Sequence, residues 1–203
     1  MFSPLSALLL ASLIATHSLS FAQSKVSSEE NEYSARHEAP NEKPESADDK
    51  LPDPTPVQPA PNLVPAALLK LGTDGFYSPY AFVVDKSTRT LTVWKSTANG
   101  LELVTIHPTD IGRKPGNKLS LGDHKTPEGL YFFDNILNAQ QLNFDEYGER
   151  AFTTDYPNYF DKLEKKTGNG IWLHGIPYKK SLKRGSRGCV VVRNKVVKTF
   201  SQI

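Results

Sequence analysis

The distribution of proline is the feature that most clearly divides this chain into a linker and a folded part. Eight of its fifteen prolines lie between residues 40 and 65, and proline fixes its own φ angle and lacks the amide hydrogen that helices and sheets use. Residues 23–62 also hold few large apolar side chains, so they can bury little surface against the entropy of ordering. We therefore expect residues 23–62 to be a disordered linker whose proline-rich half is a semi-rigid spacer. The fold is then built from residues 63–203.

The same boundary separates the charges. Residues 23–62 hold nine acidic and four basic side chains, a net charge of −5, whereas residues 63–203 hold thirteen acidic and twenty basic ones, a net charge of +7. A basic domain outside the cytoplasmic membrane favours anionic partners such as cell-wall polymers, lipid or nucleic acid. Its basic residues are scattered, except for Lys179–Lys180 and Lys183–Arg184. That cluster fits a solvated loop and a binding loop equally well.

The first 22 residues have the pattern of a secretory signal peptide. Leu8–Ala15 is an apolar run that is too short to cross a bilayer, and Ser20–Ala22 offers small residues at the positions that a signal peptidase reads. No Lys or Arg precedes the run, so an uncleaved N-terminal anchor stays open as the alternative. We expect residues 1–22 to direct export.

Residues 63–203 have the pattern of a mainly β domain with a few short helices. Strand-like segments occur at 81–85, 90–95, 101–106, 129–134, 171–174 and 190–193. A polar turn at Lys86–Arg89 predicts a hairpin between the first two of them, and Asn99–Gly100 is a typical turn before the third.

The helical patterns are short. They are expected at 66–71, from an Asp155 cap to about Lys166, and from Asn194 onward, where Val196, Val197 and Phe200 share a face. Residues 135–170 are rich in aromatic side chains and are expected to form a long insertion lying over a sheet. The chain ends at Ile203 without a helix cap or closing strand. From this pattern we expect either that the sequence is a fragment or that a further C-terminal domain follows in the full protein.

Cys189 is the only cysteine of the chain, so an intrachain disulfide is excluded. His174 ends an apolar segment fifteen residues earlier, and an imidazole is the base that a thiol nucleophile needs. Gly175 opens the backbone after the histidine, and Gly188 lets backbone N–H groups point at a developing oxyanion. From these residues alone, an inert buried cysteine is as well supported as a catalytic one.

A metal site is the other alternative for these side chains. The good ligands of the domain are His107, His124, His174 and Cys189. None of them forms the paired spacing that is typical of zinc sites, so we expect no metal and no other cofactor.

Three ordered motifs resemble the L,D-transpeptidase (YkuD-type) family. They are Gly122–Gly129 (GDHKTPEG), Gly170–Gly175 (GIWLHG) and Ser186–Cys189 (SRGC), and the similarity runs over about residues 82–194. The resemblance implies a β-sandwich-like catalytic domain that acts on peptidoglycan stem peptides in the periplasm or extracytoplasmic cell wall. It implies neither a cofactor nor a nucleic-acid partner.

The family resemblance also implies the roles of the site residues. Cys189 matches the nucleophile, which attacks the carbonyl of the diamino acid at the third stem position and expels the terminal D-alanine. His174 matches the general base, and the backbone carbonyl of Gly175 matches the group that orients it. The amides of Gly188 and Cys189, together with Arg187, match the oxyanion hole. His124 matches a residue of the substrate groove.

The chain departs from the family pattern beside the nucleophile. The usual Ser-His-Gly-Cys has Arg187 in place of its histidine, and the arginine often found two residues after the cysteine is Val191. We expect Arg187 to bind a substrate carboxylate instead and to lower the pKa of the thiol; a surface ion pair is its alternative role. These departures resemble the branch that includes helical-cell-shape L,D-carboxypeptidases and an enzyme that releases lipoprotein from peptidoglycan.

Three functions therefore stay open. The leading one is an L,D-transpeptidase that transfers the acyl group to an amine, which cross-links stems or attaches a wall-anchored protein. The second is an L,D-carboxypeptidase or amidase with water as the acceptor. The third is a non-catalytic cell-wall binding module that depends on the charge of +7 of residues 63–203.

Overall fold

The computed structural model describes residues 52–68 and 78–203, all within the unit Glu45–Ile203. The predicted signal peptide and residues 23–51 of the predicted linker lie outside these residues, as does the end of the helix predicted at 66–71. In the described part of the chain, no helix combines the length and the apolar character needed to cross a membrane.

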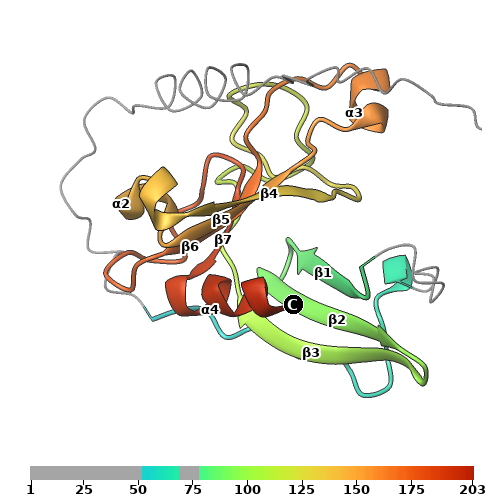
Figure 1. The fold of residues 1–203 in the computed structure, drawn as a ribbon. Helices are drawn as coiled ribbons and strands as arrows, with labels where there is room; N and C mark the ends of the chain where they lie inside the picture. Colours follow the sequence, from blue (N-terminus) through green and yellow to red (C-terminus); the bar gives the residue numbers. More distant parts are fainter. Residues whose placement is uncertain (1–51, 69–77) are drawn as a thin grey trace, which may run out of the picture. The chain divides into compact units, whose positions relative to one another are not determined.

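The first sheet is an antiparallel meander in the order β1-β2-β3 (Figure 1). Its strands are β1 (Tyr80–Asp85), β2 (Thr90–Thr97) and β3 (Gly100–Pro108). The predicted hairpin and the predicted third strand are both confirmed. The Asp85 carboxylate accepts a hydrogen bond from the Ser87 amide at 2.8 Å, which closes the turn between β1 and β2.

The second sheet has the order β4-β5-β6-β7. Its strands are β4 (Phe133–Asn138), β5 (Arg150–Thr154), β6 (Trp172–Ile176) and β7 (Val190–Arg193). The first three are antiparallel, whereas β6 and β7 are parallel. Parallel neighbours need a connection that carries the chain back along the sheet, and residues 177–189 make it here.

A hydrophobic core joins the two sheets to the C-terminal helix α4 (Asn194–Thr199), which packs on β5, β6 and β7. Its buried members are Leu91, Val93, Phe152, Leu173, Val192, Val196, Val197 and Phe200. Burial of each such side chain contributes about 1.5–3 kcal/mol relative to exposure. Phe200 begins a final 3₁₀ turn, η4 (Phe200–Gln202). The expected mainly β, sandwich-like fold with short helices is confirmed.

The predictions for residues 129–170 were partly wrong. Strand β4 begins at Phe133, four residues later than predicted, and β5 was not predicted at all. The helical elements of this region are η3 (Ala139–Gln141), α2 (Phe144–Tyr147) and α3 (Tyr159–Leu163). The cap of α3 is Asn158, not Asp155, because the Asn158 side chain accepts from the Asp161 amide.

The predicted linker contacts the domain before its expected end at residue 62. Asp53 forms an ion pair with the buried Arg193, and the Val57 amide donates to Thr90 Oγ1 at 3.0 Å. A short 3₁₀ helix, η2 (Ala66–Leu68), follows. Composition could not predict this contact, because the Asp53 carboxylate is bound by the Arg193 guanidinium, which lies 140 residues away in the sequence.

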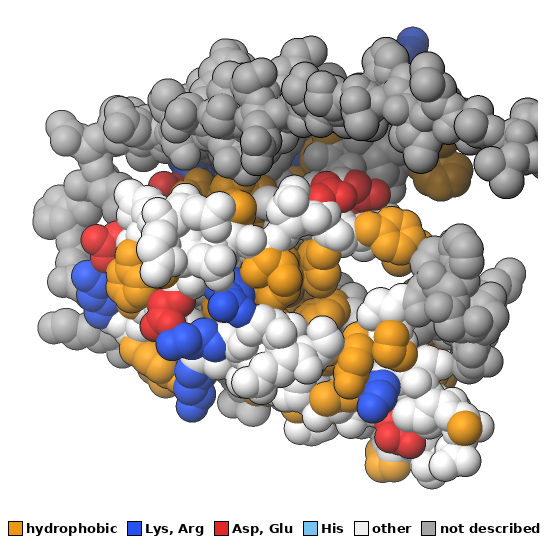
Figure 2. Space-filling view, in the orientation of Figure 1, with side chains coloured by type: hydrophobic (Ala, Val, Ile, Leu, Met, Phe, Trp, Pro, Cys, Tyr) orange, Lys and Arg blue, Asp and Glu red, His pale blue; other side chains and the backbone are white. Residues whose placement is uncertain are grey.

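The charges of the domain are interspersed on the surface. On the face shown in Figure 2, described acidic side chains lie beside basic ones. Ion pairs with solvent-exposed members also occur in the domain; examples are Lys86 with Glu128 at 2.8 Å and Lys179 with Asp145 at 3.1 Å. The net charge of the domain therefore does not gather into one uniform patch on this face.

Candidate active site

Strands β6 and β7 bring the histidine and the cysteine to one face of the second sheet. Their parallel register pairs Leu173 with Val190 and His174 with Val191. Because side chains alternate along a strand, His174 and Cys189 point to the face opposite that of Leu173. Leu173 lies in the main core, whereas Cys189 packs with a small cluster that includes Val191. One face of the second sheet thus packs into the main core, and His174 and Cys189 lie on the opposite face.

His174 is buried and its ring is oriented by backbone. Its Nδ1 lies 2.8 Å from the carbonyl oxygen of Gly175, at the place where the orienting group was expected. A carbonyl only accepts hydrogen bonds, so Nδ1 carries the proton and Nε2 keeps its lone pair. Burial lowers the pKa of His174 to about 4, although the backbone carbonyls of Gly175 and Tyr147, which favour the protonated ring, oppose the shift. At neutral pH the imidazole is therefore an uncharged base.

Cys189 is a partly buried free thiol that donates to the carbonyl of Gly170 at 3.3 Å. Burial raises its pKa, and this effect outweighs the backbone N–H of Trp172 and the charges of Arg187 and Lys118, which lower it. The expected lowering of the thiol pKa is therefore wrong. The two groups rest as a neutral thiol and a neutral imidazole, because the site that excludes water from both penalises their charged forms.

The loop before Cys189 is tightly packed at Gly188. Its φ is +143°, and a Cβ atom there would lie 2.8 Å from the carbonyl oxygen of Lys125. The Gly188 amide donates to Ser186 Oγ at 3.0 Å, and Ser186 Oγ donates to the Cys189 carbonyl at 2.6 Å. Because Ser186 Oγ accepts the Gly188 N–H, this amide joins an oxyanion hole only if that hydrogen bond changes partner. The oxyanion role of Gly188 stays a prediction.

Thr126, which belongs to the Gly122–Gly129 motif, supports the loop before Cys189 through hydrogen bonds. It is buried, donates to the Gly188 carbonyl at 2.8 Å and accepts from the Gly112 amide at 2.9 Å. The prediction of site residues did not include Thr126, although it lies inside the GDHKTPEG motif. Its role is to hold Gly188, and thereby Cys189, in place.

The other end of the same motif is organised by Asp123. Its carboxylate forms an ion pair with the buried Lys118 at 2.8 Å and accepts from the amides of Leu119, Ser120 and Lys125. Burial pushes the pKa of Asp123 upward, but the bonds from Lys118 and the amides outweigh it and hold the pKa well below its usual range. This fixes a cation whose charge is felt by the thiol of Cys189.

His124 lies in the turn where the sequence placed it, with a left-handed φ of +56°. Its carbonyl accepts from the Lys114 amide at 3.2 Å, and its Nδ1 is buried without a hydrogen-bond partner among the described residues. Burial lowers the pKa of His124, and Arg113 and Lys114 add to the shift. Its role in substrate binding stays a prediction.

Arg187 faces helix α2. It forms an ion pair with Glu146 and donates to the hydroxyl of Tyr147 at 3.5 Å. The ring of Tyr147 lies edge-on to His174, with centroids 5.2 Å apart, and 4.9 Å from the ring of Trp172. The aromatic character of the insertion is the only signal of these contacts in the sequence, and the prediction of site residues included neither Glu146 nor Tyr147.

The buried Asp110 holds the base of the loop 177–189. Its backbone pairs with Val191 in both directions at 2.9 Å, and its carboxylate accepts from the Gly185 amide at 2.7 Å and pairs with Arg89. Burial raises the pKa of Asp110, against the hydrogen bonds from Gly185 and Ile111 and the charge of Arg89. The carboxylate thus ties the first hairpin to the loop that leads to Cys189.

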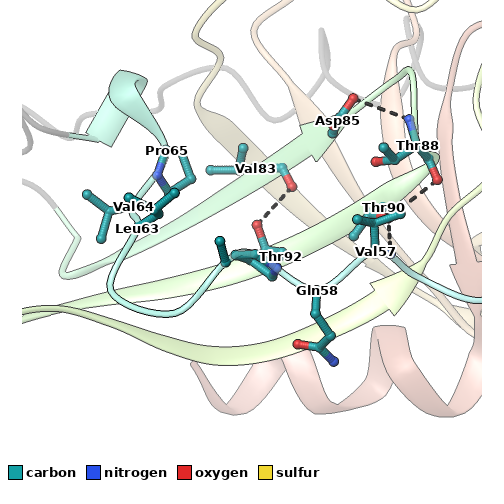
Figure 3. Close-up of a pocket in the computed structure, with 12 residues that line it drawn as sticks. Val57, Gln58, Leu63, Val64, Pro65, Val83, Asp85, Thr88, Thr90 and Thr92 are labelled. Carbon is teal, nitrogen blue, oxygen red and sulfur yellow. Dashed lines mark hydrogen bonds between the residues drawn. The ribbon is translucent and has the colours of Figure 1, made fainter.

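A separate cavity of about 370 Å³ lies under the N-terminal segment (Figure 3). Residues 57–60 and 63–65 form one wall of it, and side chains of β1 and β2 form the other. Neither Cys189 nor His174 lines this cavity. Within residues 52–68 and 78–203, no group of three or more His, Cys, Asp and Glu side chains is placed to hold a metal ion.

The fold of the two sheets and their short helices is that of a known class of domain. The model of the YkuD family, the L,D-transpeptidase catalytic domain, matches residues 79–203. The chain therefore belongs to this family.

Two solved structures are similar to the chain. Bd1075 of Bdellovibrio bacteriovorus is 49% identical with a TM-score of 0.54, over 62% of this chain and 44% of that one. The helical cell shape determining protein Pgp2 from Campylobacter jejuni is 32% identical with a TM-score of 0.54, over 61% of this chain and 43% of that one. The chain thus spans less than half the length of the solved chains it matches. The comparison with curated proteins gave no match.

Proposed function

We propose that this protein is an exported, cysteine-dependent L,D-transpeptidase of peptidoglycan stem peptides. The observation that carries the proposal is that His174 lies in β6 while Cys189 immediately precedes β7, the parallel neighbour of β6, with Nδ1 of His174 held by the Gly175 carbonyl. This leaves Nε2 as the base for the thiol. The predicted signal peptide supports action in the periplasm or extracytoplasmic cell wall.

The first half-reaction forms an acyl-enzyme. Since thiol and imidazole are both uncharged at rest, the thiol proton passes to Nε2 of His174 as Cys189 Sγ attacks the carbonyl of the diamino acid. The carbonyls of Gly175 and Tyr147 stabilise the imidazolium that forms. The tetrahedral intermediate collapses to a thioester when His174 returns the proton to the leaving amine of D-alanine.

The second half-reaction releases the enzyme. An amine of a second stem or of a wall-anchored protein attacks the thioester, His174 takes its proton, and the proton returns to Cys189 as the thiol leaves. The products are a new amide and the original thiol, so atoms and charge balance. Arg187 and His124 are the residues we assign to substrate binding.

Water is the alternative acceptor. The same acyl-enzyme would then yield a tripeptide stem, which is L,D-carboxypeptidase activity, or would detach a wall-bound protein as an amidase does. Arg187 in the SRGC motif and the 32% identity to a protein that determines helical cell shape favour this second candidate. The interspersed charges of Figure 2, the buried His174 and the partly buried Cys189 favour either enzyme over a module that binds the wall by charge alone.

Intact-protein mass spectrometry tests the proposal. The chain is mixed with a disaccharide-tetrapeptide, and a mass increase that is absent in Cys189→Ala is the expected acyl-enzyme. Analysis of the products then separates a cross-linked dimer from a tripeptide with free D-alanine. No adduct and no turnover, with a folded protein, would overturn both enzyme candidates.

A further inference from the structure

Helix α2 lies against the catalytic strand at its C-terminal end. Gly148 follows it with φ of +72°, and a Cβ atom there would lie 2.7 Å from the backbone carbon of Gly175. The Glu149 amide donates to Asn194 Oδ1 at 3.2 Å. The packing of Gly148 on Gly175 therefore fixes the position of Tyr147 relative to the Gly175 carbonyl, which orients His174.

The acidic side chains of α2 are held more loosely. Asp145 pairs with Lys179 at 3.1 Å, and both of these side chains are more than 60% exposed. Glu146 pairs with Arg187, and each of those side chains is 36% exposed. Ion pairs with this much access to solvent are weak and salt-sensitive. They can exchange one carboxylate for another without unfolding the segment around them.

Arg187 is close to the reacting groups. It lies two residues before Cys189, its charge acts on the thiol, and its guanidinium donates to the hydroxyl of the same Tyr147 whose ring lies on His174. A carboxylate that pairs with Arg187 is consequently next to the catalytic pair. In the structure that carboxylate belongs to Glu146.

We propose that Glu146 is an internal mimic of the substrate carboxylate: it holds the position at Arg187 that the terminal carboxylate of a stem peptide takes on binding. The proposal rests on the proposed function, since it concerns how that same site selects its substrate. An exchange of carboxylates keeps the guanidinium paired, which a planar, always charged group favours. A stem whose terminus is amidated cannot make the exchange. Arg187 thus sets the preference for a free carboxylate, and Glu146 lowers the affinity for it by competing for the same guanidinium.

Binding to the full chain carrying Cys189→Ala tests this, because the peptide is then not consumed. Calorimetry compares two probes, a stem tetrapeptide with a free terminal carboxylate and the same peptide with a terminal amide. Glu146→Gln removes the competitor, so the free-acid peptide should bind about two- to fivefold more tightly, the range that an ion pair of this exposure supports. The amide peptide should change less. Arg187→Gln should bring the two affinities together.

Asp145→Asn is the matched control. It removes the same charge from the neighbouring position of the same helix, but its partner is Lys179, so the free-acid preference should not change. Equal effects of Glu146→Gln on both peptides, weaker binding, or the same gain in Asp145→Asn would overturn the inference alone. No binding of either peptide by any folded variant would overturn the proposed function together with it.

Discussion

The hydroxyl of Thr126 donates to the backbone carbonyl of Gly188 across 62 residues of sequence, at 2.8 Å. The same oxygen accepts from the Gly112 amide at 2.9 Å. One buried side chain therefore satisfies two backbone groups that come from different parts of the fold. This contact fixes the backbone of Gly188, the residue before Cys189, to the first motif.

We expect Thr126→Val to destabilise the domain by about 2–4 kcal/mol, since valine fills the same space but leaves two buried backbone groups unpaired at about 1–3 kcal/mol each. Turnover should fall with it, because Gly188 loses its support. Urea unfolding gives the free energy, and Thr126→Ser, which keeps the hydroxyl, should cost less than half as much. Equal stability of Thr126→Val and the wild type would show that the Gly188 contact contributes nothing.

Gly188 and Gly100 allow backbone strain to be separated from steric overlap. Both have positive φ, +143° and +114°, but a Cβ at Gly188 would lie 2.8 Å from the Lys125 carbonyl whereas one at Gly100 meets nothing within 4 Å. We expect Gly100→Ala to cost about 1–2 kcal/mol from strain alone. Gly188→Ala should cost more and abolish acylation of Cys189. Thermal melting and the acyl-enzyme adduct report the two effects; an active Gly188→Ala would contradict the packing argument.

Local sequence predicted those parts of the fold that local sequence determines. Strand β7 was predicted at its observed bounds, because Val190–Arg193 is an apolar segment that directly follows Gly188–Cys189. Strand β5 was missed, because Arg150–Thr154 has little apolar pattern of its own and becomes a strand only between β4 and β6. Its buried Ala151 and Phe152 show that tertiary context decided the outcome.

The candidate site was likewise predictable only where local sequence determines it. The three family-like motifs indicate Cys189 and His174 as the candidate catalytic residues, whereas Thr126 and Tyr147 act through partners that are distant in sequence. The thiol pKa shows the limit clearly. The sequence shows the neighbouring charge of Arg187, which lowers the pKa of the thiol. It does not show the burial of the thiol, which raises the pKa by more than the charge lowers it. The sign of the predicted shift was wrong for that reason.

The N-terminal segment should stabilise the domain through Asp53. Arg193 is buried, and its guanidinium pairs with Asp53 while donating to the carbonyls of Pro177 and Lys180. We expect Asp53→Ala to cost about 1–3 kcal/mol, because it leaves part of a buried cation unpaired. In urea unfolding, Arg193→Leu should recover part of this loss when combined with Asp53→Ala. Strictly additive losses in the double variant would mean that the pair is not coupled.

The reactivity of Cys189 should depend on pH in the way that a neutral pair requires. Because burial raises its pKa, alkylation by iodoacetamide should be slow at pH 7 and still be increasing beyond the usual titration range of a thiol. His174 acts as a base only when it is unprotonated, and its pKa is lowered to about 4. Turnover should therefore persist down to about pH 5 and be lost as the pH falls through 4. Mass spectrometry of the alkylated protein and initial rates on the tetrapeptide give the two profiles. A fast alkylation rate that is already constant between pH 6 and 8 would instead indicate a thiolate–imidazolium pair at rest, which the burial of both groups opposes.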